Sequence, residues 1–227
     1  IEQTKPNEAE LQKMLDSYYG YNSNYSEGLY IADSNGTIQK ATESTKQESD
    51  VLNSTWYKEG ITRINMAYGS AYQNADGVNV VSASGILNDG SGDIKVISAD
   101  MTLDRISVIV NSFIEMDNAE AFLVDANSGI ILANRDSAMI SQKLGDSGQS
   151  TFFSDVAAKI DAGDYSFCTL DGNMTVFEKV TGTNWVLVSY IPKDIVLADL
   201  AQLRTIMIII SVIAIIILCV VVERVTH

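Results

Sequence analysis

The first regular pattern along this 227-residue chain is helical. Acidic residues follow Pro6, and apolar residues then recur three or four positions apart until Gly20. Side chains at that spacing share one face of a helix. The pattern therefore predicts an amphipathic N-terminal helix, with an apolar face formed by Leu11, Met14, Leu15 and Tyr18.

Two hairpin patterns follow, and they resemble each other. Residues 29–38 and 122–131 each read as an apolar strand, a turn rich in Asp and Asn that ends in Gly36 or Gly129, and a return strand. Each hairpin is followed by a helical stretch and then by paired strands. The repeated order of elements indicates that the chain contains two copies of one structural unit.

The remaining elements complete the two units. After the first hairpin we expect a helix over residues 55–66 and strands over residues 77–87 and 94–101. A bridging helix follows over residues 103–113, and after the second hairpin we expect a helix over residues 151–160 and strands over residues 165–170, 174–180 and 185–191. The fold class is α+β: two small modules with antiparallel sheets, divided as residues 1–118 and 119–191.

The pattern changes at the C-terminus, where Thr205–Val222 is uncharged and almost entirely apolar. At about 1.5 Å per residue this run makes a helix of roughly 27 Å, close to the roughly 30 Å of a bilayer core. A buried core helix is the less favoured alternative. We expect an exit helix over residues 192–204, a transmembrane helix over residues 205–222 and the start of a cytoplasmic signalling region at residues 223–227. The membrane is thus an expected partner. Residues 1–204 are expected to be extracytoplasmic, in a piece of a longer protein with another transmembrane helix before residue 1.

The composition of the chain argues against several classes of binding and catalytic site. The net charge of −14 argues against a nucleic-acid partner. The single histidine, His227, lies beyond the apolar run, so the residues before it contain no Ser-His-Asp or Cys-His arrangement and no Cys/His metal cluster. No glycine-rich phosphate loop of standard spacing is present. We therefore expect neither catalysis nor a metal or cofactor.

Three segments of the first half resemble the ligand-binding half of the double Cache (dCache) domain, a tandem PAS-like extracytoplasmic sensor of bacterial chemoreceptors. They are Trp56-Tyr57 at the start of a helix, Ala71–Gly77 leading into a strand, and Val96–Leu103 opening the next helix. The resemblance extends over the second hairpin and the exit helix. It implies two Cache modules on a long N-terminal helix, a small-molecule site in the first module, and a homodimer.

The resemblance places the ligand-binding residues at Trp56, Tyr57, Tyr72 and Asp100. Aromatic walls give a small ligand apolar contact, and a carboxylate accepts hydrogen bonds from an ammonium or another N–H group. Other interpretations remain open. Trp56 and Tyr57 also suit an ordinary core, and Asp100 also suits the cap of the helix that begins near Thr102.

One position departs from the family pattern. Members that bind amino acids carry an arginine two positions before the tryptophan, and this chain has Ser54 there. A serine cannot make a bidentate charged contact with a carboxylate. Arg63 is a candidate substitute or a surface charge, and Ser82 and Ser84 are either pocket residues or solvent-facing ones. An amine, a nucleobase or a small organic acid is therefore expected as ligand rather than an ordinary α-amino acid.

The expected function is small-molecule sensing by a transmembrane chemoreceptor, with the signal relayed through the C-terminal helix. The input domain of a sensor histidine kinase or a diguanylate cyclase is the alternative. Two rivals are less favoured. A membrane-tethered hydrolase needs two carboxylates in one cleft, and an adhesion module needs a broad exposed apolar patch.

Overall fold

The computed structural model describes residues 8–114, 116, 118–198 and 204–213. The helices are α1 (Glu8–Tyr18), α2 (Thr55–Gly60), α3 (Leu103–Ser112) and α4 (Thr151–Asp161), with short 3-10 turns η1 (Val51–Asn53) and η2 (Ser137–Met139). The strands of the first half are β1 (Tyr30–Asp33), β2 (Ile38–Lys40), β3 (Ala67–Gln73), β4 (Asn79–Leu87) and β5 (Lys95–Thr102). Those of the second half are β6 (Glu120–Asp125), β7 (Ile131–Ala133), β8 (Cys168–Leu170), β9 (Asn173–Lys179) and β10 (Trp185–Pro192).

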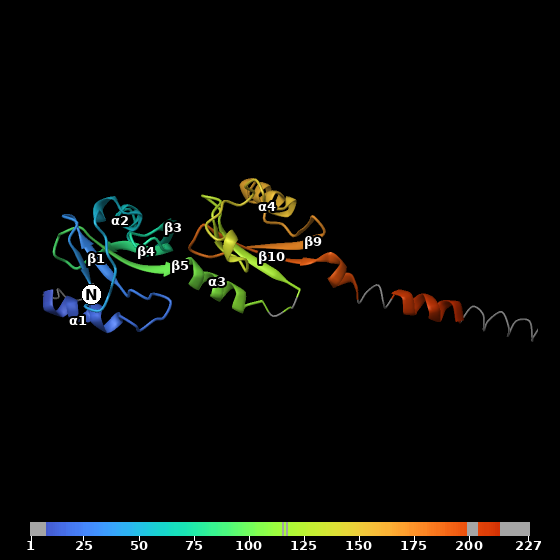
Figure 1. The fold of residues 1–227 in the computed structure, drawn as a ribbon, viewed down its shortest axis with the longest axis horizontal. Helices are drawn as coiled ribbons and strands as arrows, with labels where there is room; N and C mark the ends of the chain where they lie inside the picture. Colours follow the sequence, from blue (N-terminus) through green and yellow to red (C-terminus); the bar gives the residue numbers. More distant parts are fainter. Residues whose placement is uncertain (1–7, 115, 117, 199–203, 214–227) are drawn as a thin grey trace, which may run out of the picture.

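The strands form two five-stranded antiparallel sheets of the same topology. Their orders are β2-β1-β5-β4-β3 and β7-β6-β10-β9-β8, so each hairpin forms one edge and a later strand takes the centre. The two sheets follow one another along the length of the molecule (Figure 1). The α+β prediction with two antiparallel modules is confirmed.

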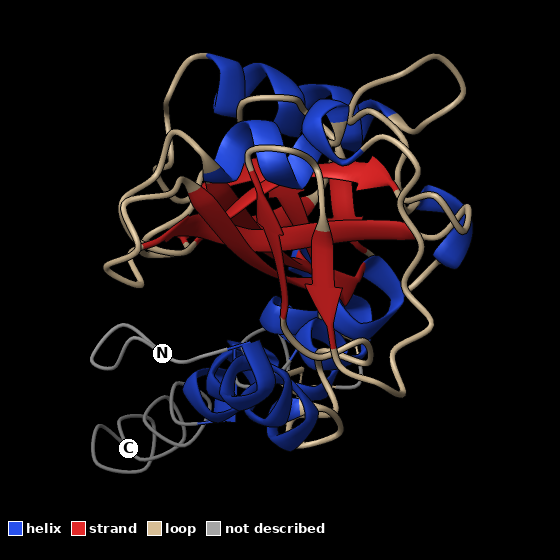
Figure 2. Cartoon of the chain, turned by 90° about the vertical axis from the view of Figure 1, so that its left-hand side faces the viewer, coloured by secondary structure: helices blue, strands red, loops and turns tan. Residues whose placement is uncertain are grey.

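Helices cover both faces of each sheet. In Figure 1, α2 lies above the first sheet and α4 above the second, whereas α1 and α3 lie below. Seen from the end of the first module, the helices again flank the strands on two sides (Figure 2). Side chains alternate between the faces of a strand. Accordingly, Ile31 and Ile97 pack with α1, whereas Tyr30 and Val96 pack with α2.

The turns of the two hairpins explain why these segments fold alike. The Asp33 carboxylate accepts the backbone N–H groups of Asn35 and Thr37, at 2.9 and 2.8 Å. Asp125 accepts the N–H of the residue two positions on in the same way. Gly36 closes the first turn at a φ of +81°, a conformation that residues with a Cβ rarely adopt.

The helix predicted over residues 55–66 is wrong in its second half. Helix α2 ends at Gly60, and β3 begins at Ala67. A Cβ at Gly60 would lie 2.4 Å from Cγ1 of Val96, so the helix approaches β5 as closely as a glycine allows. Ile61 and Ile64, which follow at helical spacing, are exposed and do not pack a prolonged helix onto the sheet. The Arg63 carbonyl instead accepts the backbone N–H of Ile86 on β4 at 2.7 Å. Arg63 therefore lies beyond the helix on which we expected it.

The C-terminal predictions are tested only in part. Residues 193–198 and 204–213 are helical, and residues 199–203 and 214–227 lie outside the described residues. Among the described residues, no helix has both the length and the apolar character needed to span a membrane. The predicted span over residues 205–222 and the segment at residues 223–227 thus fall largely outside the described part of the chain.

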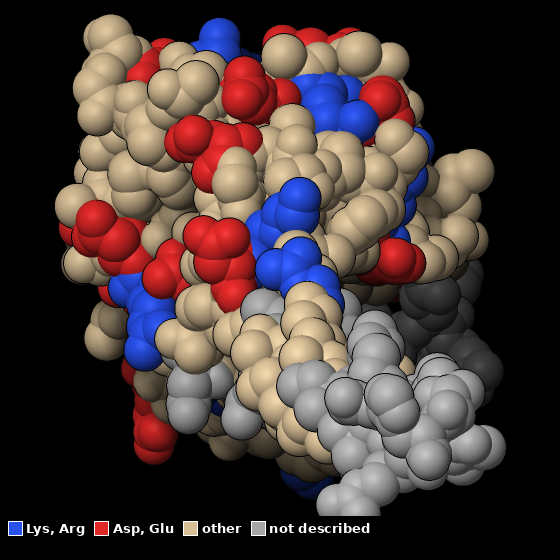
Figure 3. All heavy atoms as spheres, turned by 90° about the vertical axis from the view of Figure 1, so that its right-hand side faces the viewer, with Lys and Arg blue, Asp and Glu red and all other residues tan. Residues whose placement is uncertain are grey.

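On the face toward the C-terminal end, acidic and basic side chains are interspersed (Figure 3).

Candidate ligand-binding site

Polar side chains form a row on the α2-covered face of the first sheet. Ser82 pairs with Asp100 in the strand register, and Ser84 pairs with Ser98. Cross-strand partners point to the same face of a sheet. All four are buried, with exposed fractions of 1% for Ser82, 0% for Ser84 and Ser98, and 7% for Asp100. Ser82 and Ser84 therefore face the interior, and the solvent-facing alternative is wrong.

Asp100 is the centre of this row. Its Oδ1 accepts hydrogen bonds from the Tyr30 hydroxyl and from Ser82 Oγ, each at 2.5 Å. Because the Ser82 proton is directed to Asp100, the Tyr72 hydroxyl donates to Ser82 Oγ at 2.7 Å. The capping alternative for Asp100 is wrong, since α3 is capped by Thr102 Oγ1, which accepts the N–H of Arg105.

Both tyrosines are neutral donors, Tyr30 to the Asp100 carboxylate and Tyr72 to Ser82 Oγ. Burial, reinforced by the charge of Asp100, raises the pKa of Tyr30 well above its usual value. The same two causes raise the pKa of Tyr72 far above its usual range. Both hydroxyls therefore keep their protons near neutral pH. The Asp100 carboxylate is thus surrounded by hydroxyl groups that can donate hydrogen bonds.

A cation not expected from the sequence completes the cluster. Lys46 Nζ donates to Asp100 Oδ2 at 2.6 Å and lies 4.3 Å from the centroid of the Tyr30 ring. The Lys46 residue is only 3% exposed. The ion pair is thus buried and backed by an aromatic face.

The aromatic side of the site comes from α2. Trp56 is fully buried and meets the Tyr30 ring edge-on, with centroids 4.8 Å apart. Tyr57 is 5% exposed and packs edge-on against Trp56 at 5.8 Å. Trp56 and Tyr57 therefore belong to the core of the first module, in agreement with the alternative that they are ordinary core residues. Trp56 also contacts Tyr30, whose hydroxyl donates to Asp100.

Two polar atoms of this region are buried without a hydrogen-bond partner among the described residues. They are Nε1 of Trp56 and Oγ of Ser98. Buried polar groups in proteins are almost always hydrogen-bonded, and leaving one unpaired costs about 1–3 kcal/mol. An indole donor and a hydroxyl are therefore available to a further polar group on this face.

Arg63 lies at the border of the cluster. Its guanidinium donates to the Ala67 carbonyl at 3.1 Å, to Ser84 Oγ at 3.3 Å and to Glu59 Oε2 at 3.2 Å. The Arg63–Glu59 pair is one-quarter exposed. The structure thus brings all seven candidate residues to one region, with Arg63 held by protein groups.

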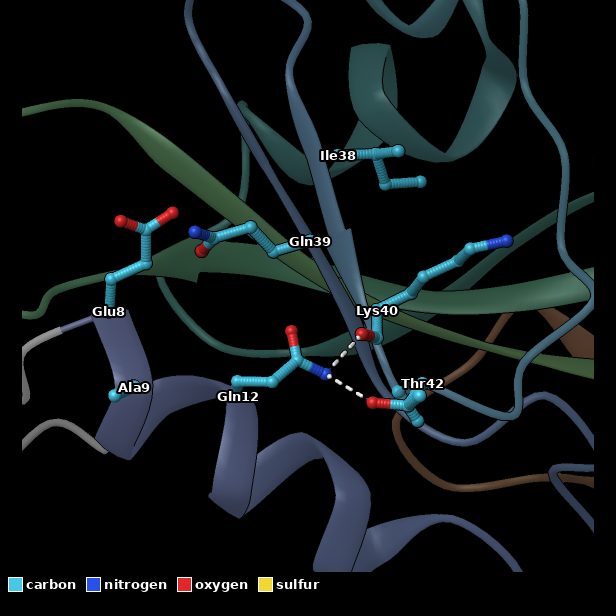
Figure 4. A pocket seen from close by; sticks show the side chains of 8 residues that line it. Glu8, Ala9, Gln12, Ile38, Gln39, Lys40 and Thr42 are labelled. Atoms are coloured by element: carbon cyan, nitrogen blue, oxygen red, sulfur yellow. Dashed lines mark hydrogen bonds between the residues drawn. The ribbon is translucent and has the colours of Figure 1, made fainter.

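Two of the hollows in the described part of the molecule lie away from this cluster. A groove of about 820 Å³ runs between α1 and β2, where Gln12 reaches across to the Lys40 carbonyl at 2.9 Å (Figure 4). A mainly apolar hollow of about 410 Å³ lies between α3 and the second sheet and is also lined by Tyr68. No candidate residue lines either hollow. Within the described residues, no group of three or more His, Cys, Asp or Glu side chains is placed to hold a metal ion.

Comparisons with known proteins agree on one family. The Cache domain model of the double type, dCache_1, matches residues 1–200. The chain resembles the ligand-binding domain of the Pseudomonas fluorescens chemoreceptor CtaA, solved with L-serine, at 19% identity and a TM-score of 0.60, over 83% of this chain and 82% of that one. No curated protein sequence matches.

Two further solved structures are similar. The ligand-binding domain of Pseudomonas aeruginosa PAO1 PctC, solved with GABA, is 18% identical with a TM-score of 0.60, over 82% of this chain and 81% of that one. The extracellular domain of the histidine kinase candidate mmHK1S-Z3 is 19% identical with a TM-score of 0.67, over 87% and 84%. Identities this low show a common fold.

Proposed function

The chain belongs to the double Cache family, and we propose that it is the extracytoplasmic input domain of a membrane sensor that binds a small molecule on the α2-covered face of its first sheet. The Cache domain is a ligand-binding sensor module and is not itself catalytic. The observation that carries the site is the buried polar row around Asp100, on a sheet face that an ordinary core fills with apolar side chains.

The charges and donors of the site support a polar ligand. Asp100 provides a carboxylate, and Trp56 Nε1 is buried without a hydrogen-bond partner among the residues that the structure describes. Ser54 stands where amino-acid-binding members carry an arginine, and Arg63 is held by Glu59 and Ser84. The ligand is therefore an amine, a nucleobase or a small organic acid rather than an ordinary α-amino acid, bound by Trp56, Tyr57, Tyr72 and Asp100.

The output is a chemoreceptor response, relayed through the segment that follows β10 into the membrane. The helical residues 193–198 directly after that strand support this route. CtaA and PctC are chemoreceptors, which favours this output, and the likeness to mmHK1S-Z3 supports a histidine kinase as the second candidate. We expect a homodimer in either case.

A thermal-shift screen tests the proposal. The full chain, kept in a mild detergent because of its apolar C-terminal run, is heated with single amines, nucleobases, organic acids and amino acids. A ligand at about 100 times its dissociation constant adds about 2.7 kcal/mol to the free energy of unfolding. A compound that raises the melting temperature is then titrated against variants.

The variants separate the site from general stability. We expect Asp100→Asn and Trp56→Phe to weaken binding at least tenfold. Asp89→Asn, in the β4–β5 turn, and Trp185→Phe, in the second module, serve as matched controls that leave the affinity unchanged. Equal affinity in the Asp100 and Trp56 variants would place the ligand elsewhere, and the absence of any bound compound would count against the sensor role.

A further inference from the structure

Lys46 fills the space in front of Asp100 in this structure. Its ammonium group lies 2.6 Å from Asp100 Oδ2 and 4.3 Å from the centroid of Tyr30, in a residue that is 3% exposed. A carboxylate beside an aromatic face is the environment that proteins provide for a bound ammonium ion. The cation position of the site is therefore already occupied by a group of the chain itself.

Asp100 is hydrogen-bonded at both oxygens by protein groups. Oδ1 receives Tyr30 and Ser82, and Oδ2 receives Lys46. Tyr30 and Ser82 lie on β1 and β4, which are held by strand neighbours on both sides. Lys46 comes from residues 41–50, which form no helix or strand. Of the three donors, Lys46 is the one whose backbone does not belong to the sheet.

We propose that Lys46 is a built-in occupant of the cation position beside Asp100, and that a ligand binds there by displacing its ammonium group with a positively charged nitrogen of its own. This inference rests on the proposed function and narrows its ligand class. Exchange of one ammonium for another leaves the buried charge unchanged. A ligand without a cation that displaced Lys46 would leave the Asp100 carboxylate buried without a counter-charge, which is strongly unfavourable.

Displacement of the Lys46 ammonium group by a ligand costs free energy, because the segment that carries Lys46 is held in place. The Glu27 carboxylate holds the Lys46 segment by accepting hydrogen bonds from Ser44 Oγ, from the backbone N–H and the hydroxyl of Thr45, and from the N–H of Lys46, at 2.7, 2.7, 3.0 and 2.9 Å. A group tethered this closely competes at an effective concentration of mM order or higher. The apparent affinity for a free amine is the intrinsic affinity multiplied by the fraction of molecules in which Lys46 has left the site. Removal of the Lys46 ammonium should therefore tighten amine binding.

Chemical rescue tests the proposal without knowledge of the natural ligand. Lys46→Ala removes a propyl chain with its ammonium group, and n-propylammonium chloride supplies the same atoms in free form. We expect n-propylammonium to raise the melting temperature of Lys46→Ala with a saturable dependence, at concentrations at least about tenfold below those that affect the wild-type chain. Sodium chloride and n-propanol, tested at the same concentrations, should have no such effect.

Two variants fix the location of the effect. Lys46→Ala/Asp100→Asn has no carboxylate at the site and should not respond to n-propylammonium. Lys95→Ala removes a lysine that pairs with Asp89 in the same module and should respond like the wild type. If Lys46→Ala is unfolded alone, the titration becomes a refolding assay, in which n-propylammonium must restore the circular dichroism spectrum.

The outcomes separate this inference from the proposed function. Equal sensitivity of Lys46→Ala and the wild type, or a response that survives loss of Asp100, would overturn the role of Lys46. In the ligand screen, binding of butyrate in preference to GABA, abolished by Asp100→Asn, would leave the sensor role intact and overturn the cation exchange. Failure of every compound to bind the wild type, together with successful rescue of Lys46→Ala, would overturn the sensor role and the displacement by a ligand, and would leave Lys46 as the occupant of the cation position.

Discussion

Replacing Lys46 by methionine should be the most costly single change to the charges of the first module. The side chains of Lys46 and Asp100 are 2% and 7% exposed and lie 2.6 Å apart. Removal of one member of a buried ion pair costs about 3–5 kcal/mol, because the other charge remains buried without compensation. Tyr30 and Ser82 still donate to Asp100 in Lys46→Met, which favours the lower end, about 3 kcal/mol. Folded domains are stable by only about 5–15 kcal/mol, so the loss is readily measured.

The assay is urea unfolding followed by tryptophan fluorescence in a Trp185→Phe background. The chain has two tryptophans, so Trp56 then reports the first module alone. The double variant Lys46→Met/Asp100→Asn keeps an oxygen acceptor for Tyr30 and Ser82 and contains no charge at the pair. We expect it to recover most of the lost free energy, because a neutral pair needs no compensation. Lys95→Met, which breaks a more exposed pair with Asp89, should cost about 1 kcal/mol or less. A double variant no more stable than Lys46→Met would refute the assignment of the loss to an uncompensated charge.

Three further experiments test the close packing of Gly60, the ion pair of Asp89 and the burial of the tyrosines. Gly60→Ala should destabilise the first module by about 1–3 kcal/mol, measured by the same urea assay, because the added methyl group would lie 2.4 Å from Cγ1 of Val96. Burial opposes ionisation of Asp89, but hydrogen bonds from Lys95 and Ser91 outweigh it and lower the pKa to about 2. The stability that Asp89 contributes is therefore present above its unfolded pKa of 3.8 and is lost as pH falls through about 2, so wild type and Asp89→Asn should converge in acid melts. Burial or partial burial raises the pKa of Tyr30, Tyr57, Tyr68, Tyr72 and Tyr190, so stability should fall as pH rises above 10.0, and an alkaline titration should show the phenolate absorbance of these tyrosines mainly on unfolding. Ionisation of these five near pH 10.0 in the folded state would contradict that prediction.

The sequence predicts the candidate site residues that lie on strands. It does not predict those that lie in irregular segments. Alternation along a strand puts Ser82 and Ser84 on one face, and the register brings Asp100 to the same face. The two hairpins were visible because an Asp-rich turn closed by glycine has a local sequence signature. The order of the strands in each sheet is set by distant contacts and had no such signature.

Lys46 and β3 show what local patterns miss. Lys46 lies in a polar stretch that resembles an ordinary surface loop, and its partner is 54 residues away in the sequence. Strand β3 was not predicted, because the pairing of its Tyr68 and Ala71 with β4 shifts register around Gly69 and Ser70 and so interrupts the alternation along the strand. A polar loop residue becomes recognisable as buried only when the sheet it covers is known.

Strand β5 links the proposed ligand site to the second module, beside contacts from β3 and β4. Asp100 faces α2, and Met101, the next residue of β5, faces the opposite side. Met101 packs there with Leu103 and Ile106 of α3 in a cluster that includes Trp185 of β10. Thr102 caps α3 directly after the strand. Because Asp100 and Met101 are consecutive residues of β5, we expect a displacement of β5 at the proposed ligand face to displace the start of α3 and its contact with β10, the strand that continues into the C-terminal helical residues.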